Sequence, residues 1–383
     1  MKKSLLSLVA VTALSTTMFA SDVRVSGFAS VVGGYIDNAE VGARTNAEEP
    51  GFGGYTSESV EFQPDSFAGI QFSKSVTDDM SATVQMVARF EDEDAKVGLE
   101  WAYINYNLSE DLTLQAGRFL PDMLLYSNTL NIGYSYLWIA PPTETYTMTF
   151  MRYVDGANLI YSHEFDNEMV LSSSAYFANT NQKAKTALGE TRDFEYKDIW
   201  GISAQLSNEY VKLRAGVHGR SVTINGIDWT DGSSRTPTQA DHIAFDDSKA
   251  IFTNVALSVD YEDIILISEY TVKNIEDTVS VDESTAYYAT LGYRMGKFTP
   301  HVTYSVLESE PEYIDDSKVD AARSIKAIDS ETIAVGLRYD LNMYSALKFE
   351  YQNNSVTPHD KKDSTNQVQT DANLYKIALN IAF

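Results

Sequence analysis

Basic side chains recur at alternate positions in several segments, a spacing that can place positive charges along one face of a strand. In VKLRAGVHGR, residues 211–220, Lys212, Arg214 and Arg220 alternate with apolar residues such as Val211. A row of guanidinium and ammonium groups on a wet surface attracts anions and orients polar solutes. The residues predicted to form this basic wall are Arg24, Arg89, Arg214, Arg220, Arg294, Arg338 and Lys212.

Two sets of acidic residues could face this basic wall, and each set implies a different function for it. Asp122, Glu144 and Asp155 lie in or beside one unusual segment and can oppose the basic wall to create a transverse field. In the other interpretation the basic residues only form ion pairs that stabilise the wall. The candidate partners are then Glu100, Asp260, Asp340 and Glu350.

Enzymatic chemistry has little support in the sequence. The 5 histidines are each separated by more than 20 residues, so no local metal-binding pair such as H-E-x-x-H exists. Neither a G-x-S-x-G elbow nor a Walker loop is present. His301 near Ser305 is the pairing to check for a hydrolase assembled from different strands. We therefore predict a protein that is not an enzyme and that needs neither a metal nor a cofactor.

The composition and the N-terminus indicate an exported chain. MKKSLLSLVAVTALSTTMFA, residues 1–20, has a charged start, an apolar middle and Ala20 at a plausible cleavage site, which predicts a signal peptide. Its removal changes the formal charge from -25 to -27, so nucleic acid is an unsuitable partner. The chain has no cysteine, hence no disulfide and no thiolate nucleophile. Residues 21–383 are predicted to form one domain.

Strict alternation of apolar and polar residues is the main structural signal. In ETIAVGLRYD, Ile333, Val335 and Leu337 share one face, while Thr332 and Arg338 lie on the other. After residue 20 no stretch approaches the roughly 20 apolar residues of a membrane-spanning helix. An exported chain with two-faced strands is then either a soluble secreted or periplasmic protein or a closed β-barrel.

Connections between these strands alternate between short turns and long polar stretches, which is the pattern of an outer-membrane barrel. VTDDM (76–80), FDNEM (165–169) and RMGKF (294–298) are examples of the short turns. Aromatic residues such as Tyr210 and Tyr261 cluster beside them, as in a membrane-interface girdle. We predict an all-β fold, a transmembrane antiparallel β-barrel of about sixteen strands.

The least strand-like segment follows the fifth predicted strand, at residues 120–156. It carries many large apolar residues that would be costly to leave in water, so it is predicted to fold into the barrel as loop 3. The alternative is packing at a contact between copies. The predicted constriction residues are Arg118, Asp122, Tyr126, Tyr134, Tyr136, Trp138, Glu144 and Asp155. Arg118 follows the apolar phase of its strand, so either it snorkels at a rim or a bulge turns it inward.

Two local motifs carry a family resemblance. The last strand alternates apolar residues and ends in Phe, which resembles the assembly signal of Gram-negative outer-membrane porins; its residues are Tyr375, Ile377, Leu379, Ile381 and Phe383. R-x-x-x-P, G-Y-x-Y and W-x-x-P-P-x-E-x-Y elements in residues 118–146 resemble loop 3 of a porin group in marine and related Gram-negative bacteria. The PEFGG loop tip of the enteric general porins is absent.

The resemblance implies a porin in the bacterial outer membrane. It implies passive diffusion of small hydrophilic solutes and ions past loop 3, a homotrimer, contact with outer-membrane lipid and lipopolysaccharide, and insertion by the barrel assembly machinery. A channel selective for sugars or organic acids, with aromatic residues of 126–146 as a stacking track, is the alternative within this class. A barrel adhesin or receptor and an embedded hydrolase are alternatives of other classes.

Overall fold

The protein is described here from a computed structural model that covers residues 23–37, 55, 59–91, 94–149, 151–185, 191–225, 248–276, 283–310, 327–359 and 369–383. The predicted signal peptide, residues 1–20, lies outside the described residues. Across the described ranges, no helix is long and apolar enough to cross a membrane.

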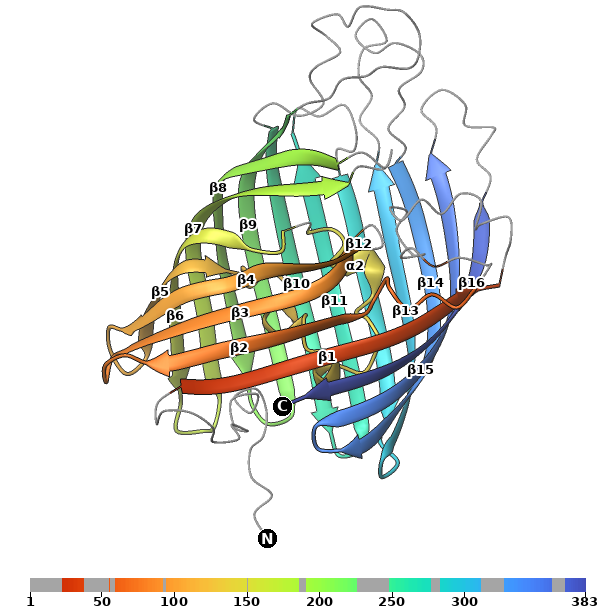
Figure 1. The fold of residues 1–383 in the computed structure, drawn as a ribbon, viewed down its shortest axis with the longest axis horizontal. Coiled ribbons are helices and arrows are strands. Elements are labelled where there is room, and N and C mark those ends of the chain that lie inside the picture. Colours follow the sequence, from red (N-terminus) through yellow and green to blue (C-terminus); the bar gives the residue numbers. More distant parts are fainter. Residues whose placement is uncertain are drawn as a thin grey trace, which may run out of the picture.

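Sixteen antiparallel strands form a closed barrel in which every strand pairs with its neighbours in the chain and β1 pairs with β16 (Figure 1). The strands are β1 (Val23–Ile36), β2 (Phe67–Ser75), β3 (Met80–Glu91), β4 (Asp94–Asn107), β5 (Leu112–Phe119), β6 (Val154–Glu164), β7 (Val170–Lys185), β8 (Thr191–Ser207), β9 (Val211–Asn225), β10 (Ser248–Tyr261), β11 (Ile264–Ile275), β12 (Glu283–Tyr293), β13 (Phe298–Glu310), β14 (Ala327–Asn342), β15 (Ser345–His359) and β16 (Thr370–Ala382). The predicted antiparallel barrel of about sixteen strands is confirmed.

The alternation in the sequence becomes an inner and an outer face of the barrel. On β14, Ile333 and Val335 are 46% and 54% exposed, whereas Thr332 and Ala334 point inward and are buried. Successive side chains of a strand leave opposite faces, so an apolar outer face and a polar inner face follow directly from the period of two. The exposed apolar face suits a lipid environment.

The two ends of the chain close the barrel. Phe383 N–H donates to the Gly27 carbonyl oxygen at 2.8 Å, and Gly27 N–H donates to the Phe383 carbonyl oxygen at 2.7 Å. The Phe383 ring lies over Gly27 so closely that a Cβ there would approach a ring atom to 2.4 Å. Gly27 is therefore required for this close approach, and closure leaves neither terminal strand as an open edge.

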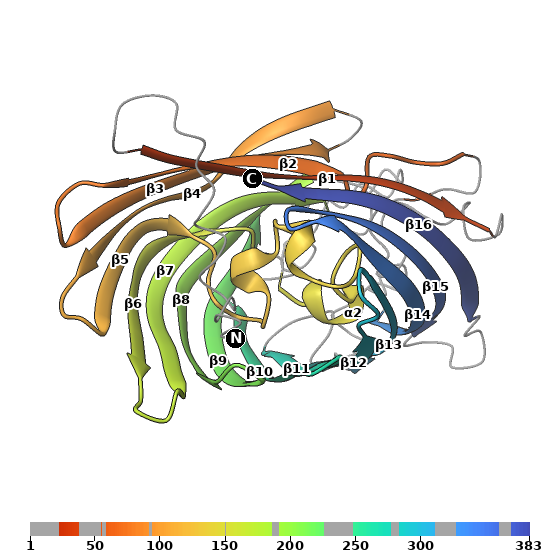
Figure 2. The same ribbon diagram turned by 90° about the horizontal axis from the view of Figure 1, so that it is seen from below.

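The chain between β5 and β6 folds into the barrel, as Figure 2 shows with α2 inside the ring of strands. It contains the short 3₁₀ helices η2 (Ser127–Thr129) and η3 (Gly133–Ser135) and the single-turn helix α2 (Thr143–Tyr146). The inward position predicted for loop 3 is confirmed. We call residues 120–153 the inward loop.

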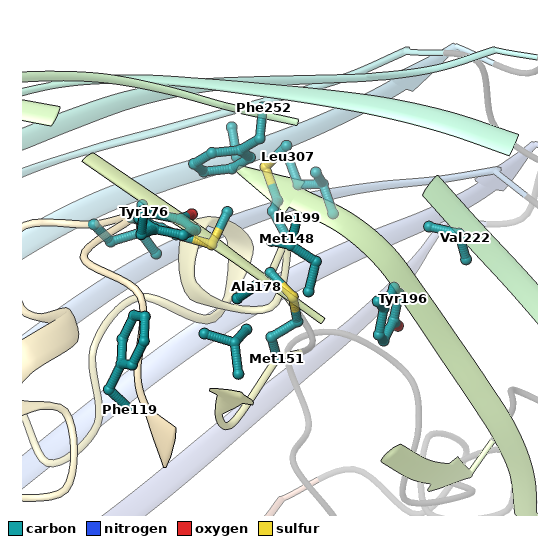
Figure 3. Close-up of a cluster of buried hydrophobic side chains, with 14 residues drawn as sticks. Phe119, Met148, Met151, Tyr176, Ala178, Tyr196, Ile199, Val222, Phe252 and Leu307 are labelled. Atoms are coloured by element: carbon teal, nitrogen blue, oxygen red, sulfur yellow. The ribbon is translucent and has the colours of Figure 1, made fainter. Parts of the chain in front are cut away.

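Buried apolar clusters lie where the inward loop meets the barrel wall. In one, Met148 and Met151 of the loop pack with Tyr176, Ile199 and Phe252 of the wall (Figure 3). Another joins Tyr136, Leu137 and Trp138 of the loop to wall residues Ile265, Ile267 and Tyr288. Burial of these surfaces removes apolar area from water and stabilises the inward position of the loop.

Candidate functional site

The W-x-x-P-P-x-E-x-Y motif attaches the inward loop to the wall. Trp138 Nε1 donates to Thr303 Oγ1 at 2.8 Å and to Thr290 Oγ1 at 3.1 Å, on β13 and β12. Pro142 precedes α2, where its fixed φ and missing N–H are tolerated at a helix start. The helix turn Thr143–Tyr146 then directs the motif's remaining polar side chains at the wall.

Glu144 is held by hydroxyl groups of two strands. It is 1% exposed and accepts hydrogen bonds from Ser305 at 2.8 Å, Ser330 at 3.1 Å and Thr332 at 2.5 Å. A buried carboxylate is expensive unless such donors replace water. The Ser305 hydroxyl is thus bound to Glu144, and the pairing with His301 considered for a hydrolase is not formed.

Glu269 on β11 is the second polar attachment point. Its carboxylate accepts from Tyr146 Oη at 2.6 Å, Tyr288 Oη at 2.7 Å, the Leu125 backbone N–H at 2.9 Å and Asn254 Nδ2 at 3.1 Å. Two of the four donors belong to the inward loop. Hydrogen bonds to an ionised acceptor are roughly twice as strong as neutral ones, so this carboxylate fixes the loop at two places, Leu125 and the last residue of α2.

Two cations of the wall bind backbone carbonyl groups of the inward loop. Lys348 Nζ, from β15, donates to the carbonyl oxygens of Gly133, Tyr136 and Trp138 at 2.6, 2.8 and 2.5 Å. Arg338 on β14 donates to the carbonyl oxygens of Tyr134 and Tyr136 at 2.8 and 3.0 Å. These bonds satisfy carbonyl groups that an irregular segment cannot pair within itself.

Other members of the basic wall are also engaged. Arg214 donates to a carboxylate oxygen of Asp122 at 2.7 Å and to the Asp122 carbonyl oxygen. Arg89 contacts Glu100 and the Asn131 side chain of the inward loop, both at 2.5 Å. With Arg338, these arginines position the loop, so their charges do not line a path as free groups.

The remaining predicted wall residues divide into two groups. Arg294 forms a two-point ion pair with Asp260, with both distances at 2.5 Å, beside a short turn. Arg24, Lys212 and Arg220 share the inward phase of their strands, and within the described ranges none of them forms a salt bridge. Of the two interpretations of the wall, ion pairing accounts for Arg89, Arg294 and Arg338.

Arg118 and Asp155 lie on the outer face, which corrects their prediction as constriction residues. β5 keeps its phase, with Arg118 opposite Asp155 on β6, and the two form a two-point ion pair at 2.8 and 2.9 Å. The guanidinium carbon lies 3.8 Å from the Tyr153 ring centroid. Gly117 has φ 130° and approaches the Ala102 carbonyl too closely for a Cβ, but the strand phase is kept and the arginine stays outside.

The aromatic residues of the inward loop pack against each other and the wall. Trp138 lies 5.6 Å from Tyr126, 6.3 Å from Tyr136 and 5.5 Å from Tyr288, measured between ring centroids. Tyr136 and Trp138 are buried, and Tyr134 lies under the Arg338 guanidinium at 4.6 Å. The aromatic side chains therefore attach the loop to the wall. Because their faces are used in these contacts, they are disfavoured as a stacking track for sugars.

The wall residues that hold the loop were not predicted from the sequence. Lys348 and Glu269 are charges on the inward phase of their strands, each with a second inward charge nearby, Glu350 and Lys273, and charge on this face is a signal that could have identified them. Thr290, Ser330 and Thr332 carried no such signal, because threonine and serine are ordinary on a wet strand face. Their role follows from what the loop places against them.

The fold is a sixteen-stranded antiparallel barrel with an inward third loop, and it is similar to that of solved outer-membrane porins. Similar solved structures include OmpT of Vibrio cholerae, at 13% identity over 96% of this chain and 100% of that chain with a TM-score of 0.57. The outer membrane channel DcaP of Acinetobacter baumannii aligns at 14% identity over 94% and 97% of the chains, with a TM-score of 0.57.

An anion-selective porin from Comamonas acidovorans aligns at 10% identity over 94% and 99% of the chains, with a TM-score of 0.58. No protein-family model matches the chain, and no curated protein sequence matches it either. At these identities the likeness concerns the fold, which is that of the outer-membrane porins.

Proposed function

We propose that this chain is a porin of the Gram-negative outer membrane, a water-filled channel for passive diffusion of small hydrophilic solutes and ions. The observation that carries the proposal is the inward loop, held to β11–β15 through Glu269, Lys348 and the Trp138–Tyr146 motif. A barrel of sixteen strands is too wide for its own side chains to fill, so one loop fixed against the wall narrows an aqueous lumen.

The proposal assigns the charges of the lumen different roles. Arg89, Arg214 and Arg338 position the inward loop, whereas Arg24, Lys212 and Arg220 act on permeating ions. A field from fixed charges in a narrow, low-dielectric passage selects ions by sign. Replacing Lys212 with Gln is expected to lower the permeability of chloride relative to potassium.

The proposed porin function also implies an oligomeric state for the chain and a set of partners in the membrane. One of the similar structures is a trimer form of OmpT from Vibrio cholerae, which supports a homotrimer for this chain. The apolar outer face contacts outer-membrane lipid, with lipopolysaccharide at the outer leaflet, and the terminal strand from Tyr375 to Phe383 is presented to the barrel assembly machinery. No enzymatic step and no cofactor enter the mechanism.

Planar-bilayer recording of the detergent-purified mature chain tests the channel. We expect stepwise ohmic openings in potassium chloride. Glu269→Gln removes the ionised acceptor of four hydrogen bonds, each worth about 1.5–3 kcal/mol, and should produce larger or flickering openings as the inward loop loosens. Glu262→Gln, at an exposed turn, is the matched control.

Silence from protein that is folded, as judged by heat-modifiable migration on a gel, would contradict the channel itself. Openings of Glu269→Gln that match the wild type in size and noise would remove the inward loop as the constriction. The two outcomes are independent, because the first concerns the barrel and the second concerns the loop.

A further inference from the structure

A second segment enters the barrel from the first connection, the chain between β1 and β2, of which residues 55 and 59–66 are described. Tyr55 of this connection is 1% exposed. Its ring lies over Gly34 of β1 so closely that a Cβ at Gly34 would not fit. Gly34 shares the inward phase of β1 with Val32, which packs with Ile139 of the inward loop. Tyr55 therefore lies on the inner face of the wall, two residues along β1 from a contact of the inward loop.

Apolar packing and hydrogen bonds both hold the first connection in this position. The Tyr55 ring packs in a buried cluster whose other members lie on β1, β15 and β16: Ile36, Val356, Ala372 and Leu374. Ser66 Oγ accepts from the Val32 backbone N–H at 2.9 Å. Glu61 and Gly34 exchange two backbone hydrogen bonds, each at 2.8 Å. Tyr55 is thus held by the packing of its ring and by the attachment of the residues that follow it.

A row of polar and charged groups connects Tyr55 to the inward loop. Tyr55 Oη donates to Asp65 Oδ2 at 2.8 Å, and Lys376 Nζ lies 3.5 Å from the same oxygen. Lys376 Nζ also lies 3.6 Å from Oε1 of Glu350, its cross-strand neighbour on β15. Glu350 Oε2 accepts from the Ile139 backbone N–H at 3.3 Å. Every step from Tyr55 to the inward loop is therefore a polar contact of 2.8–3.6 Å.

Burial makes the members of this row depend on one another. The side chains of Lys376 and Glu350 are 5% and 1% exposed. Lys376 lies between two carboxylates, so loss of the lysine removes the cation that compensates both of them. Glu350 holds the loop at the Ile139 backbone, whereas Glu269 and Lys348 hold it at other backbone groups. The row is therefore an additional attachment of the inward loop, and it begins in another connection of the barrel.

We propose that Tyr55 positions the inward loop from the long-connection end of the barrel, acting through Asp65, Lys376 and Glu350. The inference deepens the proposed channel function, on which it rests, by adding a second inward element that sets the constriction. Displacement of the first connection withdraws the Tyr55 ring from the wall and weakens the hold of Glu350 on the loop. The position of the first connection is thereby coupled to the width of the passage.

Hydrogen exchange of the detergent-purified mature protein, read at the amides of residues 137–140, tests the row directly. Lys376→Met should raise exchange at these amides about tenfold or more, because charge-assisted contacts are lost. Lys376→Arg keeps a cation that can bridge both carboxylates and should restore slow exchange. A purely steric role of the lysine stem would leave Lys376→Met, which has a similar length, close to the wild type.

A double-mutant cycle tests whether Tyr55 acts through Glu350. Tyr55→Phe keeps the ring, removes the hydroxyl group that binds Asp65 and should raise exchange at residues 137–140. In a Glu350→Gln background the same change should add nothing, since the charge that joins Lys376 to the loop is already removed. Tyr293→Phe, which lies 49% exposed beside a short turn, is the matched control and should change exchange in neither background.

Each variant is first checked for heat-modifiable migration, and Lys376→Arg guards against loss of folding in Lys376→Met. Unchanged exchange in folded Lys376→Met, or additive effects of Tyr55→Phe and Glu350→Gln, would each overturn the proposal. Potassium chloride conductance together with additive effects rejects the coupling and keeps the channel, whereas coupled exchange in a protein that does not conduct does the reverse.

Discussion

At the residue scale, the lumen shows how buried charges are satisfied without ion pairs. Lys348 is 1% exposed, and all three of its N–H donors bind carbonyl oxygens of the inward loop. Glu144 is equally buried and accepts from three hydroxyl groups. A buried charge with its full set of hydrogen bonds fixes one geometry, since any displacement leaves it unpaired.

Lys348→Met tests this role of the lysine. The substitution keeps the length of the side chain and removes three charge-assisted hydrogen bonds of about 1.5–3 kcal/mol each, so the loop segment that carries Gly133, Tyr136 and Trp138 should detach. We expect increased hydrogen exchange in residues 130–140 and normal exchange in the strands. Lys74→Met, on the exposed end of β2, should change neither. Unchanged exchange in residues 130–140 would exclude Lys348 as an anchor.

The phenol groups of the inward loop predict a dependence on alkaline pH. Burial raises the pKa of Tyr126, Tyr136 and Tyr146 above the ordinary value of 10.0. A raised pKa means that the folded loop holds these protons more tightly than the free chain does. The stabilisation of the attached loop by these protonated phenol groups is complete below about pH 10. It is lost as the pH rises through the raised pKa values of the three tyrosines.

We therefore expect a high-pH step in phenolate absorbance, when the loop detaches and its tyrosines ionise. A Tyr126→Phe, Tyr136→Phe double variant should lose amplitude from this step alone. Loss of amplitude at lower pH instead would mean that these phenols are accessible.

At the element scale, the strands could be predicted and the attachment of the loop could not. Alternation fixes which residues of a strand face lipid, and the one misfit in β3, Val87, is informative: it is 1% exposed and packs with Phe28 and Ile132. The break in the alternation at Val87 thus indicated that an apolar segment, the inward loop, packs on the inner face of β3. The partners of Lys348 and Glu144 depend on how an irregular segment folds, which periodicity does not encode.

Phe383, which follows β16, makes two separable contributions to closure of the barrel, one through its ring and one through its backbone. Phe383→Ala removes the ring over Gly27 but keeps the two backbone hydrogen bonds, whereas deletion of Phe383 removes both. We expect a moderate loss of folded, heat-modifiable protein in the outer membrane for the first variant and a larger loss for the second. Equal losses would assign the whole effect to the ring. Wild-type yield of both would remove Phe383 from assembly.

At the scale of the whole molecule, two rows of aromatic residues mark the limits of an apolar band. Tyr293 and Phe298 belong to the row beside the short turns, and Tyr287, Tyr304 and Tyr375 belong to a second row further along the strands. With a rise of about 3.3 Å per residue and a tilt of about 40°, their separation is about 15–20 Å. With the rings included, this matches an apolar band of about 25 Å.

Cysteine labelling tests the orientation of the barrel in lipid, since the chain has no native cysteine. A fluorophore on Leu213→Cys or Val335→Cys should be quenched by lipids with brominated acyl chains, because these side chains are 52% and 54% exposed on the outer face. A fluorophore on Ser26→Cys, in the inward phase of β1, should respond to aqueous iodide instead. Reversed accessibility would place the apolar face inside.

The attachment of the inward loop also sets an order of events during biogenesis. The loop is synthesised between β5 and β6, yet Gly133 binds Lys348 at a separation of 215 residues and Glu144 binds Thr332 at a separation of 188. Contacts of such long range form only after the intervening chain is in place. The inward loop therefore reaches its final position last, and a half-built barrel carries an unattached aromatic segment that chaperones must shield.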